Sequence, residues 1–404
     1  MPKPSRRNFL SASLGAASLG LLPAAVSTAA PPADARAQLR IRDVETILLR
    51  FPPGRVYSDA IHTFGTDRGA VVVKVHTDAG ITGWGYSSFG MMPGGPKVVK
   101  TIIDEELKPA LAGQDPFMNK KLRGELWKAT EYHGVQGVAQ FGIGALDIAL
   151  WDICGKALDT PVYRMLGGFH DRIPAYAMVG WYYETDDEYR RAVAAAAEEG
   201  FRAVKIKVGR GSLEEDARRI EIARQLMGKS GRVMVDANQV HANDLPEVMR
   251  RGRAYQQLGV FWYEEPFPPH ERNAYAELAA ALDINIATGE NLYTKHEFFE
   301  YMLARAVDVV QPDNRRAGGV TEWMEIAAIA DAFGLRVASH GGGPTNVHML
   351  CAMPNSIYLE TGSVRNNRTY KESLRMVDGS ILAPQSPGMG SELQDEYVSK
   401  YRVA

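Results

Sequence analysis

Residues 203–236 read AVKIKVGRGSLEEDARRIEIARQLMGKSGRVMVD and contain the repeating unit of the fold. Two short apolar runs flank a segment in which apolar and charged residues follow a helical period. Similar runs recur between amphipathic segments, and the eight that we predict as strands are 175–179, 203–208, 233–235, 261–263, 284–287, 307–310, 336–338 and 357–359. Eight strands that alternate with helices predict an α/β fold, a parallel (β/α)8-type TIM barrel.

Polar side chains stand in or next to most of the predicted strands. In order along the chain they are Lys205, Lys207, Asp236, Glu264, Glu290, Asp313, His340 and Glu360. From Lys207 onward they are 20 residues (His340 to Glu360) to 29 residues (Lys207 to Asp236) apart, the length of one strand and helix unit. Active sites of such barrels lie at the carboxyl ends of the strands, so we expect these side chains to converge. The alternative is that the acids only cap the following helices.

Three of these residues are carboxylates from consecutive strands: Asp236, Glu264 and Glu290. Carboxylate oxygens are hard ligands, and a set of three favours Mg²⁺ over softer metals. The sequence therefore predicts a magnesium site at the mouth of the barrel.

Residues 36–138 have a different pattern. Alternation with a period of two predicts strands over 39–51, 70–76 and 82–86, and helices follow over roughly 96–111 and 116–132. We expect an N-terminal α+β capping domain here, the barrel over 139–368, and a C-terminal segment, 369–404, that returns to the cap. The connections 52–69 and 87–96 are long and rich in Gly and Pro, and long loops are more often functional than idle.

The first 35 residues have the features of a twin-arginine export signal. The motif Ser5-Arg6-Arg7-Asn8-Phe9-Leu10 precedes an apolar stretch that is too short and too weakly apolar for a membrane span. The alternative is a disordered basic tail. We expect export to the bacterial periplasm.

Composition narrows the class of partner. The chain has 46 Lys and Arg against 48 Asp and Glu, a formal net charge of -2, which does not suggest binding to nucleic acid. Its two cysteines, Cys154 and Cys351, form neither a disulfide framework nor a zinc pattern. We expect a small-molecule partner and no membrane association.

Short motifs surround the polar residues named above. They are Lys205-Ile206-Lys207, Asp236-Ala237-Asn238-Gln239, Trp262-Tyr263-Glu264-Glu265-Pro266, Thr288-Gly289-Glu290-Asn291, Gln311-Pro312-Asp313, Gly318-Gly319, Ser339-His340-Gly341 and Leu359-Glu360-Thr361. Together they resemble the mandelate racemase subgroup of the enolase superfamily, the mandelate racemase/muconate lactonizing enzyme family. The resemblance covers essentially everything after the export segment. It implies that Glu264 is a Mg²⁺ ligand and that Glu265 lies behind the ligands.

The resemblance also implies an activity, removal of the proton next to a carboxylate through an enediolate. Lys207, close to cationic Lys205 and near the metal, would have a lowered pKa and act as the base. His340 would face the substrate from the opposite side, oriented by Asp313. Glu360, if kept protonated by its negative surroundings, would donate a hydrogen bond to the enediolate.

Within the family, the sixth strand ends in Asp313 where dipeptide epimerases and muconate cycloisomerases have a lysine, so the match is to racemases and acid-sugar dehydratases. We expect dehydration of an aldonate or aldarate to a 2-keto-3-deoxy acid. The alternatives are a racemase or epimerase of a 2-hydroxy acid and, more remotely, an exported binding protein without turnover.

Several further residues are candidates for supporting the ligands or contacting the substrate. They are Asn238, Glu265, Asn291, Arg315, Arg316, Tyr57, His62 and Trp181. The family also implies a homo-oligomer, from dimer to octamer. The sequence shows no cause for that assembly.

Overall fold

The computed structural model describes residues 39–65, 68–88, 94–134, 136–183, 185–365 and 369–403. Residues 38–404 form one compact unit. The predicted export signal, 1–35, lies outside the described residues.

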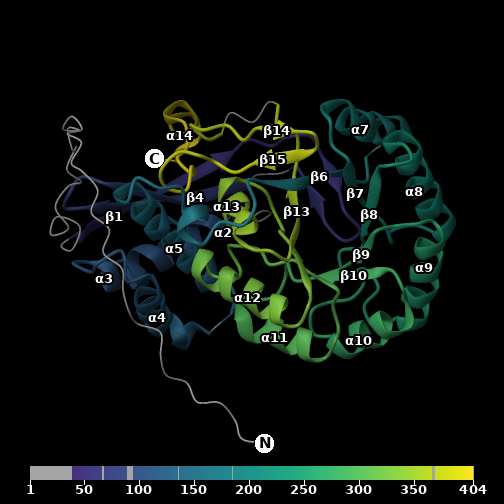
Figure 1. Cartoon of the computed structure of the whole chain (residues 1–404), viewed down its shortest axis with the longest axis horizontal. Helices are drawn as coiled ribbons and strands as arrows, with labels where there is room; N and C mark the ends of the chain where they lie inside the picture. Colours follow the sequence, from purple (N-terminus) through teal and green to yellow (C-terminus); the bar gives the residue numbers. More distant parts are fainter. Residues whose placement is uncertain are drawn as a thin grey trace, which may run out of the picture. The chain divides into compact units, whose positions relative to one another are not determined.

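The cap begins with a three-stranded antiparallel sheet of order β1-β4-β5 (Figure 1). Its strands are β1 (Ile41–Phe51), β4 (Arg68–Thr77) and β5 (Thr82–Ser87), close to the predicted bounds. The helices that follow are α2 (Gly95–Ile102), the π-helical turn η1 (Ile103–Leu107), α3 (Lys108–Leu111), α4 (Asn119–Thr130) and the 3-10 turn η2 (Glu131–His133). The single helix predicted over 96–111 is therefore three segments joined through a π turn.

The long connection 52–69 contains a small hairpin that the sequence did not predict. Its strands are β2 (Tyr57–Ser58) and β3 (Thr63–Phe64). Ser58 also forms an isolated antiparallel bridge with Tyr182, which follows the first barrel strand. The hairpin therefore brings a cap segment against the barrel.

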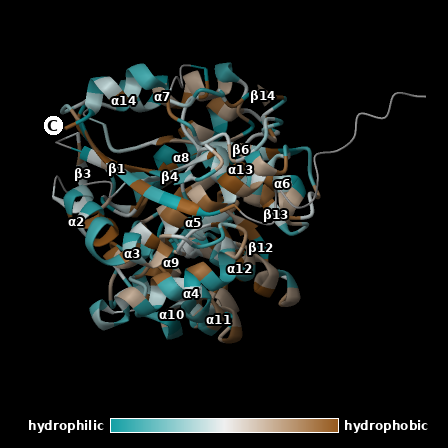
Figure 2. Ribbon diagram, turned by 90° about the vertical axis from the view of Figure 1, so that its left-hand side faces the viewer, coloured by the Kyte–Doolittle hydropathy of each residue, from teal (hydrophilic) through white to brown (hydrophobic). Residues whose placement is uncertain are grey.

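Helix α5 (Val138–Ala157) connects cap and barrel, and it is apolar on nearly every side. It is long and apolar enough to cross a membrane by length and composition, but 89% of that window is buried inside the structure. A Cβ at Gly85 of β5 would lie 1.8 Å from the carbonyl oxygen of Ala145. Strand β5 and helix α5 are therefore in backbone contact. The hydrophobic residues along α5 are coloured brown in Figure 2.

The barrel matches the predicted architecture. Within the described residues, eight parallel strands form a closed ring in sequence order, with β13 pairing back onto β6. The strands are β6 (Arg172–Gly180), β7 (Ala203–Lys207), β8 (Arg232–Asp236), β9 (Trp262–Glu264), β10 (Asn285–Thr288), β11 (Val309–Val310), β12 (Arg336–Ala338) and β13 (Ser356–Thr361). The accompanying helices are α6 (Val162–Met165), α7 (Asp186–Glu199), α8 (Leu213–Met227), α9 (Leu245–Gln257), α10 (Arg272–Ala281), α11 (Thr294–Leu303), α12 (Val320–Ala332) and α13 (Pro344–Ala352). Figure 1 shows helices α7 to α11 outside the ring of strands.

One apolar layer fills the inside of the barrel. It consists of Tyr176, Ala203, Met234, Trp262, Ala287, Val309 and Ala338, one from each strand from β6 to β12. Side chains two positions further along a strand point to the same face. The layer above this apolar floor is therefore formed by residues such as Lys205, Asp236 and Glu264.

The C-terminal segment contacts both parts of the structure. Strands β14 (Met376–Val377) and β15 (Ser380–Leu382) form a hairpin, and β15 pairs antiparallel with β6. Helix α14 (Asp395–Tyr401) then leads to Val403, whose backbone N–H donates to the carbonyl of Leu48 in β1 at 2.9 Å. The exact domain boundaries stay predictions.

Candidate active site

Strand register brings the predicted polar residues to one level. Lys207 of β7 is paired with Asp236 of β8, and Asp236 is paired with Glu264 of β9. Parallel strands without a shift in register hold these residues side by side at the carboxyl end of the barrel.

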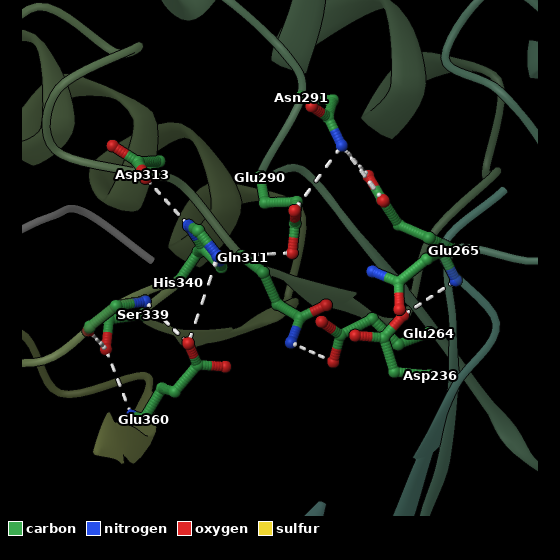
Figure 3. A network of polar contacts seen from close by, with 12 residues as sticks. Asp236, Glu264, Glu265, Glu290, Asn291, Gln311, Asp313, Ser339, His340 and Glu360 are labelled. Atoms are coloured by element: carbon green, nitrogen blue, oxygen red, sulfur yellow. Dashed lines mark hydrogen bonds and ion pairs between the residues drawn. The ribbon is translucent and has the colours of Figure 1, made fainter. Parts of the chain in front are cut away.

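The acidic cluster consists of Asp236, Glu264 and Glu290. One carboxylate oxygen from each residue lies within 4.8 Å of the others (Figure 3). Nearby, Oδ1 of Asn238 is buried and has no hydrogen-bond donor among the described residues, while its backbone N–H donates to Asp236 Oδ1 at 2.9 Å. Converging carboxylates with an unsatisfied oxygen beside them fit a hard divalent cation such as Mg²⁺, so the residues present suit that ion.

Lys205 lies in the same layer as this cluster, above the apolar floor, and is 1% exposed. Its Nζ donates at 2.6 Å to both Glu264 Oε1 and Glu360 Oε2. Burial lowers the pKa of Lys205, but these two carboxylates outweigh burial and raise it well above its ordinary value. Lys205 is therefore a fixed cation that offsets part of the negative charge.

Lys207 contacts the Asp236 end of the cluster. Its Nζ donates to Asp236 Oδ2 at 2.6 Å and lies 4.8 Å from the centre of the Trp181 ring. Burial lowers the pKa of Lys207, but the Asp236 carboxylate outweighs burial and raises it. Lys205 lowers this pKa, as expected, but among the side chains the Asp236 carboxylate counts for more. The lowering expected from Lys205 together with a nearby metal ion stays a prediction.

His340 contacts the other end. Its Nε2 lies 3.3 Å from Glu290 Oε2, and its Nδ1 is 2.7 Å from Asp313 Oδ2 (Figure 3). Since a carboxylate only accepts hydrogen bonds, Nδ1 carries the proton in this contact. Burial lowers the pKa of His340, but Glu290, Glu360 and Asp313 together raise it to about 9.

Glu360 does not have the environment that we expected. It accepts hydrogen bonds from Lys205 Nζ at 2.6 Å, from Tyr176 Oη at 2.8 Å and from the backbone N–H of Gly341 at 3.1 Å. Burial raises its pKa, but Lys205 and His340 lower it below the ordinary value. The expectation of a protonated Glu360 is wrong, because its partners are donors and cations; it is an ionised acceptor that holds Lys205.

Comparison with known families supports the resemblance in both parts of the chain. Residues 45–167 match the family described as mandelate racemase / muconate lactonizing enzyme, N-terminal domain. Residues 188–397 match the family described as enolase C-terminal domain-like, which is more than half of the chain. The chain belongs to the mandelate racemase/muconate lactonizing enzyme family of the enolase superfamily.

Characterised relatives in this family act on sugar acids by name. Arabinonate dehydratase of Saccharolobus solfataricus is 34% identical over 82% of this chain and 90% of its own length. The 3,6-anhydro-alpha-L-galactonate cycloisomerase of Streptomyces coelicolor is 32% identical over 90% of this chain and 99% of its own.

Solved structures of family members agree in fold. A racemase from Streptomyces coelicolor with bound magnesium has a TM-score of 0.84 and 31% identity, covering 90% of this chain and 100% of the other. L-Talarate dehydratase from Polaromonas, complexed with Mg and L-glucarate, has a TM-score of 0.84 and 30% identity, covering 91% and 98%. The family thus includes magnesium-bound structures whose chains superpose on nearly all of this one.

Two residues to which the sequence analysis gave no role, Trp262 and Gln311, hold the carboxylate of Glu264. Glu264 Oε2 accepts from Trp262 Nε1 at 3.0 Å and from Gln311 Nε2 at 2.8 Å. Gln311 and Trp262 stand inside the family motifs, and Trp262 is two positions before Glu264. The alternation of a strand was therefore a signal that could have revealed the Trp262 contact.

Glu265 lies behind the acidic cluster. Its carboxylate accepts hydrogen bonds from Asn291 Nδ2 at 2.9 Å and from Gln239 Nε2 at 3.0 Å. Burial and the charge of Glu290 raise the pKa of Glu265 to about 8. Asn238 and Glu265 also have positive φ angles of 45° and 40°, so the ends of β8 and β9 carry backbone strain at the site.

The hairpin of the cap forms an aromatic wall near Lys207. The Tyr57 ring centre lies 4.7 Å from that of Trp181 and 5.3 Å from that of Phe64. His62 is less closely engaged, since its side chain is 44% exposed and its Nδ1 lies 3.2 Å from Asp59 Oδ2. Trp181 is thus next to the base candidate and Tyr57 packs against Trp181, whereas His62 is more exposed.

The two arginines after Asp313 have separate partners. Arg315 contacts the Asp313 carboxylate and Ser88 of the cap. Arg316 Nη1 donates to the backbone carbonyl of Glu290 at 2.6 Å. Both guanidinium groups are engaged by the protein in this structure.

Proposed function

We propose that this protein is a Mg²⁺-dependent dehydratase of an acid sugar, an aldonate or aldarate, and that it forms a 2-keto-3-deoxy acid. One observation carries the proposal: Lys207 and His340 contact opposite ends of a single acidic cluster, at Asp236 and Glu290. They also come from β7 and from the end of β12, which lie apart in the ring of strands. A carboxylate bound over the cluster would therefore have a proton-transfer group on each side.

Each group has one task in the proposed reaction. Lys207 first loses its own proton to solvent, because its raised pKa keeps the side chain protonated at rest. The neutral amine then accepts the proton from the α-carbon, and the electron pair moves toward the carboxylate to give the enediolate. His340 donates the proton on Nε2 to the β-hydroxyl, which leaves as water while the double bond forms. The Nε2 atom of His340 is the ring nitrogen that faces the acidic cluster, 3.3 Å from Glu290 Oε2, because Nδ1 is held by Asp313. Mg²⁺ held by Asp236, Glu264 and Glu290 would stabilise the negative charge on the substrate carboxylate.

The other side chains hold this arrangement. Asp313 fixes the orientation of the His340 ring through Nδ1. Lys205 is held by Glu264 and Glu360 and places positive charge beneath the bound carboxylate. Asn238 Oδ1, which has no donor among the described residues, would face the metal or a substrate hydroxyl.

A racemase or epimerase of a 2-hydroxy acid is the second candidate, because a solved magnesium-bound racemase has nearly the same chain fold. It would use the same two groups, with His340 returning a proton to the α-carbon from the other face. The relatives named as dehydratases of sugar acids favour dehydration.

The test is a panel of aldonic, aldaric and 2-hydroxy acids with Mg²⁺ in D₂O, followed for 2-keto product and for deuterium at the α-carbon. We expect 2-keto acid from at least one sugar acid, and its loss in Lys207→Ala but not in Lys229→Ala, an exposed lysine before β8. Deuteration with inversion and no 2-keto product would support the racemase. Tight binding of an acid with neither reaction would support a binding protein.

We also propose that the chain is exported to the periplasm and assembles as a homo-oligomer. The motif at residues 5–10 supports export. In a bacterial host, replacement of Arg6 and Arg7 by lysine should keep the protein in the cytoplasm. N-terminal sequencing of the periplasmic fraction should find residues 1–35 largely removed.

A further inference from the structure

Arg315 uses most of its hydrogen-bond donors within the protein. Its Nε lies 2.9 Å from Asp313 Oδ1 and 3.1 Å from Oδ2, and its Nη2 donates to Oδ2. Its Nη1 donates to Ser88, at 2.7 Å to Oγ and at 3.2 Å to the carbonyl oxygen. A guanidinium group has five N–H donors, so few remain for a substrate. This pattern favours a role inside the protein over the substrate contact that we first considered.

The Asp313 carboxylate is shared between two partners. Its Oδ2 receives both the Nδ1–H of His340 and Nη2 of Arg315. Its Oδ1 receives the backbone N–H of Arg315 at 2.7 Å. Rotation of this carboxylate would break the contact with His340 as well as the contacts with Arg315. The Arg315 side chain therefore adds to the backbone N–H groups of Arg315 and Arg316, which both donate to Oδ1, in fixing the carboxylate that orients the imidazole.

Ser88 belongs to the cap. It follows β5, the strand in backbone contact with α5, and it also borders a cavity of about 210 Å³ that is lined by His340, Arg315 and Tyr86 among others. The side chain of Arg315 is 23% exposed. Within the described residues it forms a continuous polar path from Ser88 of the cap through Asp313 to His340.

We infer that Arg315 is a positioning residue that ties the acid-base pair His340–Asp313 to the cap through Ser88. The inference rests on the proposed function, because it assigns His340 the role of the acid. Loss of the Arg315 side chain leaves Asp313 held by backbone N–H groups at Oδ1 and by His340 at Oδ2, so the carboxylate turns more easily and His340 points less well at the leaving hydroxyl. Removal of the α-proton by Lys207 does not pass through Arg315 and should continue.

The first experiment needs no substrate. The His340 Nδ1–H, which is 2.7 Å from Asp313 Oδ2 between the heavy atoms, should give a low-field proton signal in ¹⁵N-histidine-labelled protein, to be assigned by its loss in His340→Asn. We expect Arg315→Met to shift or abolish this signal, Ser88→Ala to shift it less, and Arg315→Lys to restore part of it. Arg253→Met is the control, because Arg253 is an exposed arginine on α9, and it should leave the signal in place. An unchanged signal in Arg315→Met would overturn the inference.

The second experiment uses the acid that the wild type dehydrates fastest. In Arg315→Met we expect the kcat for dehydration to fall about 100-fold, since a misplaced catalytic group costs about that much. Exchange of the α-proton in D₂O should stay within about 3-fold, with KM little changed. Parallel loss of both reactions would mean a merely structural role and would refute the inference. A wild type that neither dehydrates nor exchanges any acid would refute the proposed function, whereas the proton signal would still decide the role of Arg315.

Discussion

Replacement of Asp147 by Asn should raise the free energy of unfolding relative to the wild type, by an amount that grows with pH. Asp147 is fully buried on α5, and its oxygens accept from the backbone N–H of Thr321 at 2.9 Å and from Thr321 Oγ1 at 2.6 Å, at the start of α12. Burial raises its pKa to about 6 from the ordinary 3.8, in spite of these hydrogen bonds. The folded state therefore favours the protonated form more strongly than the unfolded chain does.

The sign and size of the effect follow from this difference. Below the pKa that Asp147 has in the unfolded chain, the side chain is protonated in both states. The folded state then holds the neutral acid that it prefers, and the contribution of Asp147 to stability is fully present. That contribution is lost as the pH rises through the folded pKa, because the ionised carboxylate is then buried. A shift of two units corresponds to about 3 kcal/mol at pH 7, and the same linkage gives roughly 0.5 kcal/mol at pH 4. The amide of Asn fits the same space, accepts from the Thr321 N–H and carries no charge to bury.

The assay is urea unfolding followed by tryptophan fluorescence at pH 4, 5, 6 and 7 in EDTA. We expect the stability of Asp147→Asn relative to the wild type to increase steadily over this range, by about 2 kcal/mol or more. Asp331→Asn, an exposed residue near the end of α12, is the control for loss of a charge and should show a much smaller change. A difference between Asp147→Asn and wild type that does not vary with pH would refute the reasoning.

Two further predictions concern the metal site and the cap. Mg²⁺ should stabilise the EDTA-treated protein, by about 2.7 kcal/mol at a concentration 100-fold above its Kd, because it offsets the repulsion among carboxylates that lie within 4.8 Å. In Glu290→Gln the same thermal shift should require more Mg²⁺, and an equal response would argue against Glu290 as a ligand. Gly85→Ala should destabilise the protein by about 3 kcal/mol in urea unfolding, because its Cβ would lie 1.8 Å from the Ala145 carbonyl. Gly124→Ala in α4, where a Cβ meets nothing within 4 Å, should be neutral or slightly stabilising, and equal effects of the two changes would contradict the packing argument.

The barrel was predictable because each strand and helix unit repeats the same physical pattern. The apolar runs fill a closed ring, and the period of two along a strand places Lys205, Asp236 and Glu264 one layer above the apolar floor. The hairpin of Tyr57 to Phe64 was not predictable in the same way, since strands of two residues have no measurable periodicity. It is held by contacts between distant parts of the chain, such as the bridge from Ser58 to Tyr182 and the packing of Tyr57 against Trp181.

The residue types of the site were also readable from the sequence, but their electrostatic states were not. Lys205 lowers the pKa of Lys207, as expected, but the Asp236 carboxylate, 2.6 Å from Lys207, raises it by more. A sequence shows that two lysines are two positions apart and therefore on one face. It does not show which carboxylate each of them meets, and at these distances the nearest opposite charge decides the direction of the shift. The same reasoning applies to Arg315, whose partners Asp313 and Ser88 are 2 and 227 residues away. Only the folded chain distinguishes an arginine that binds substrate from one that holds the acid in place.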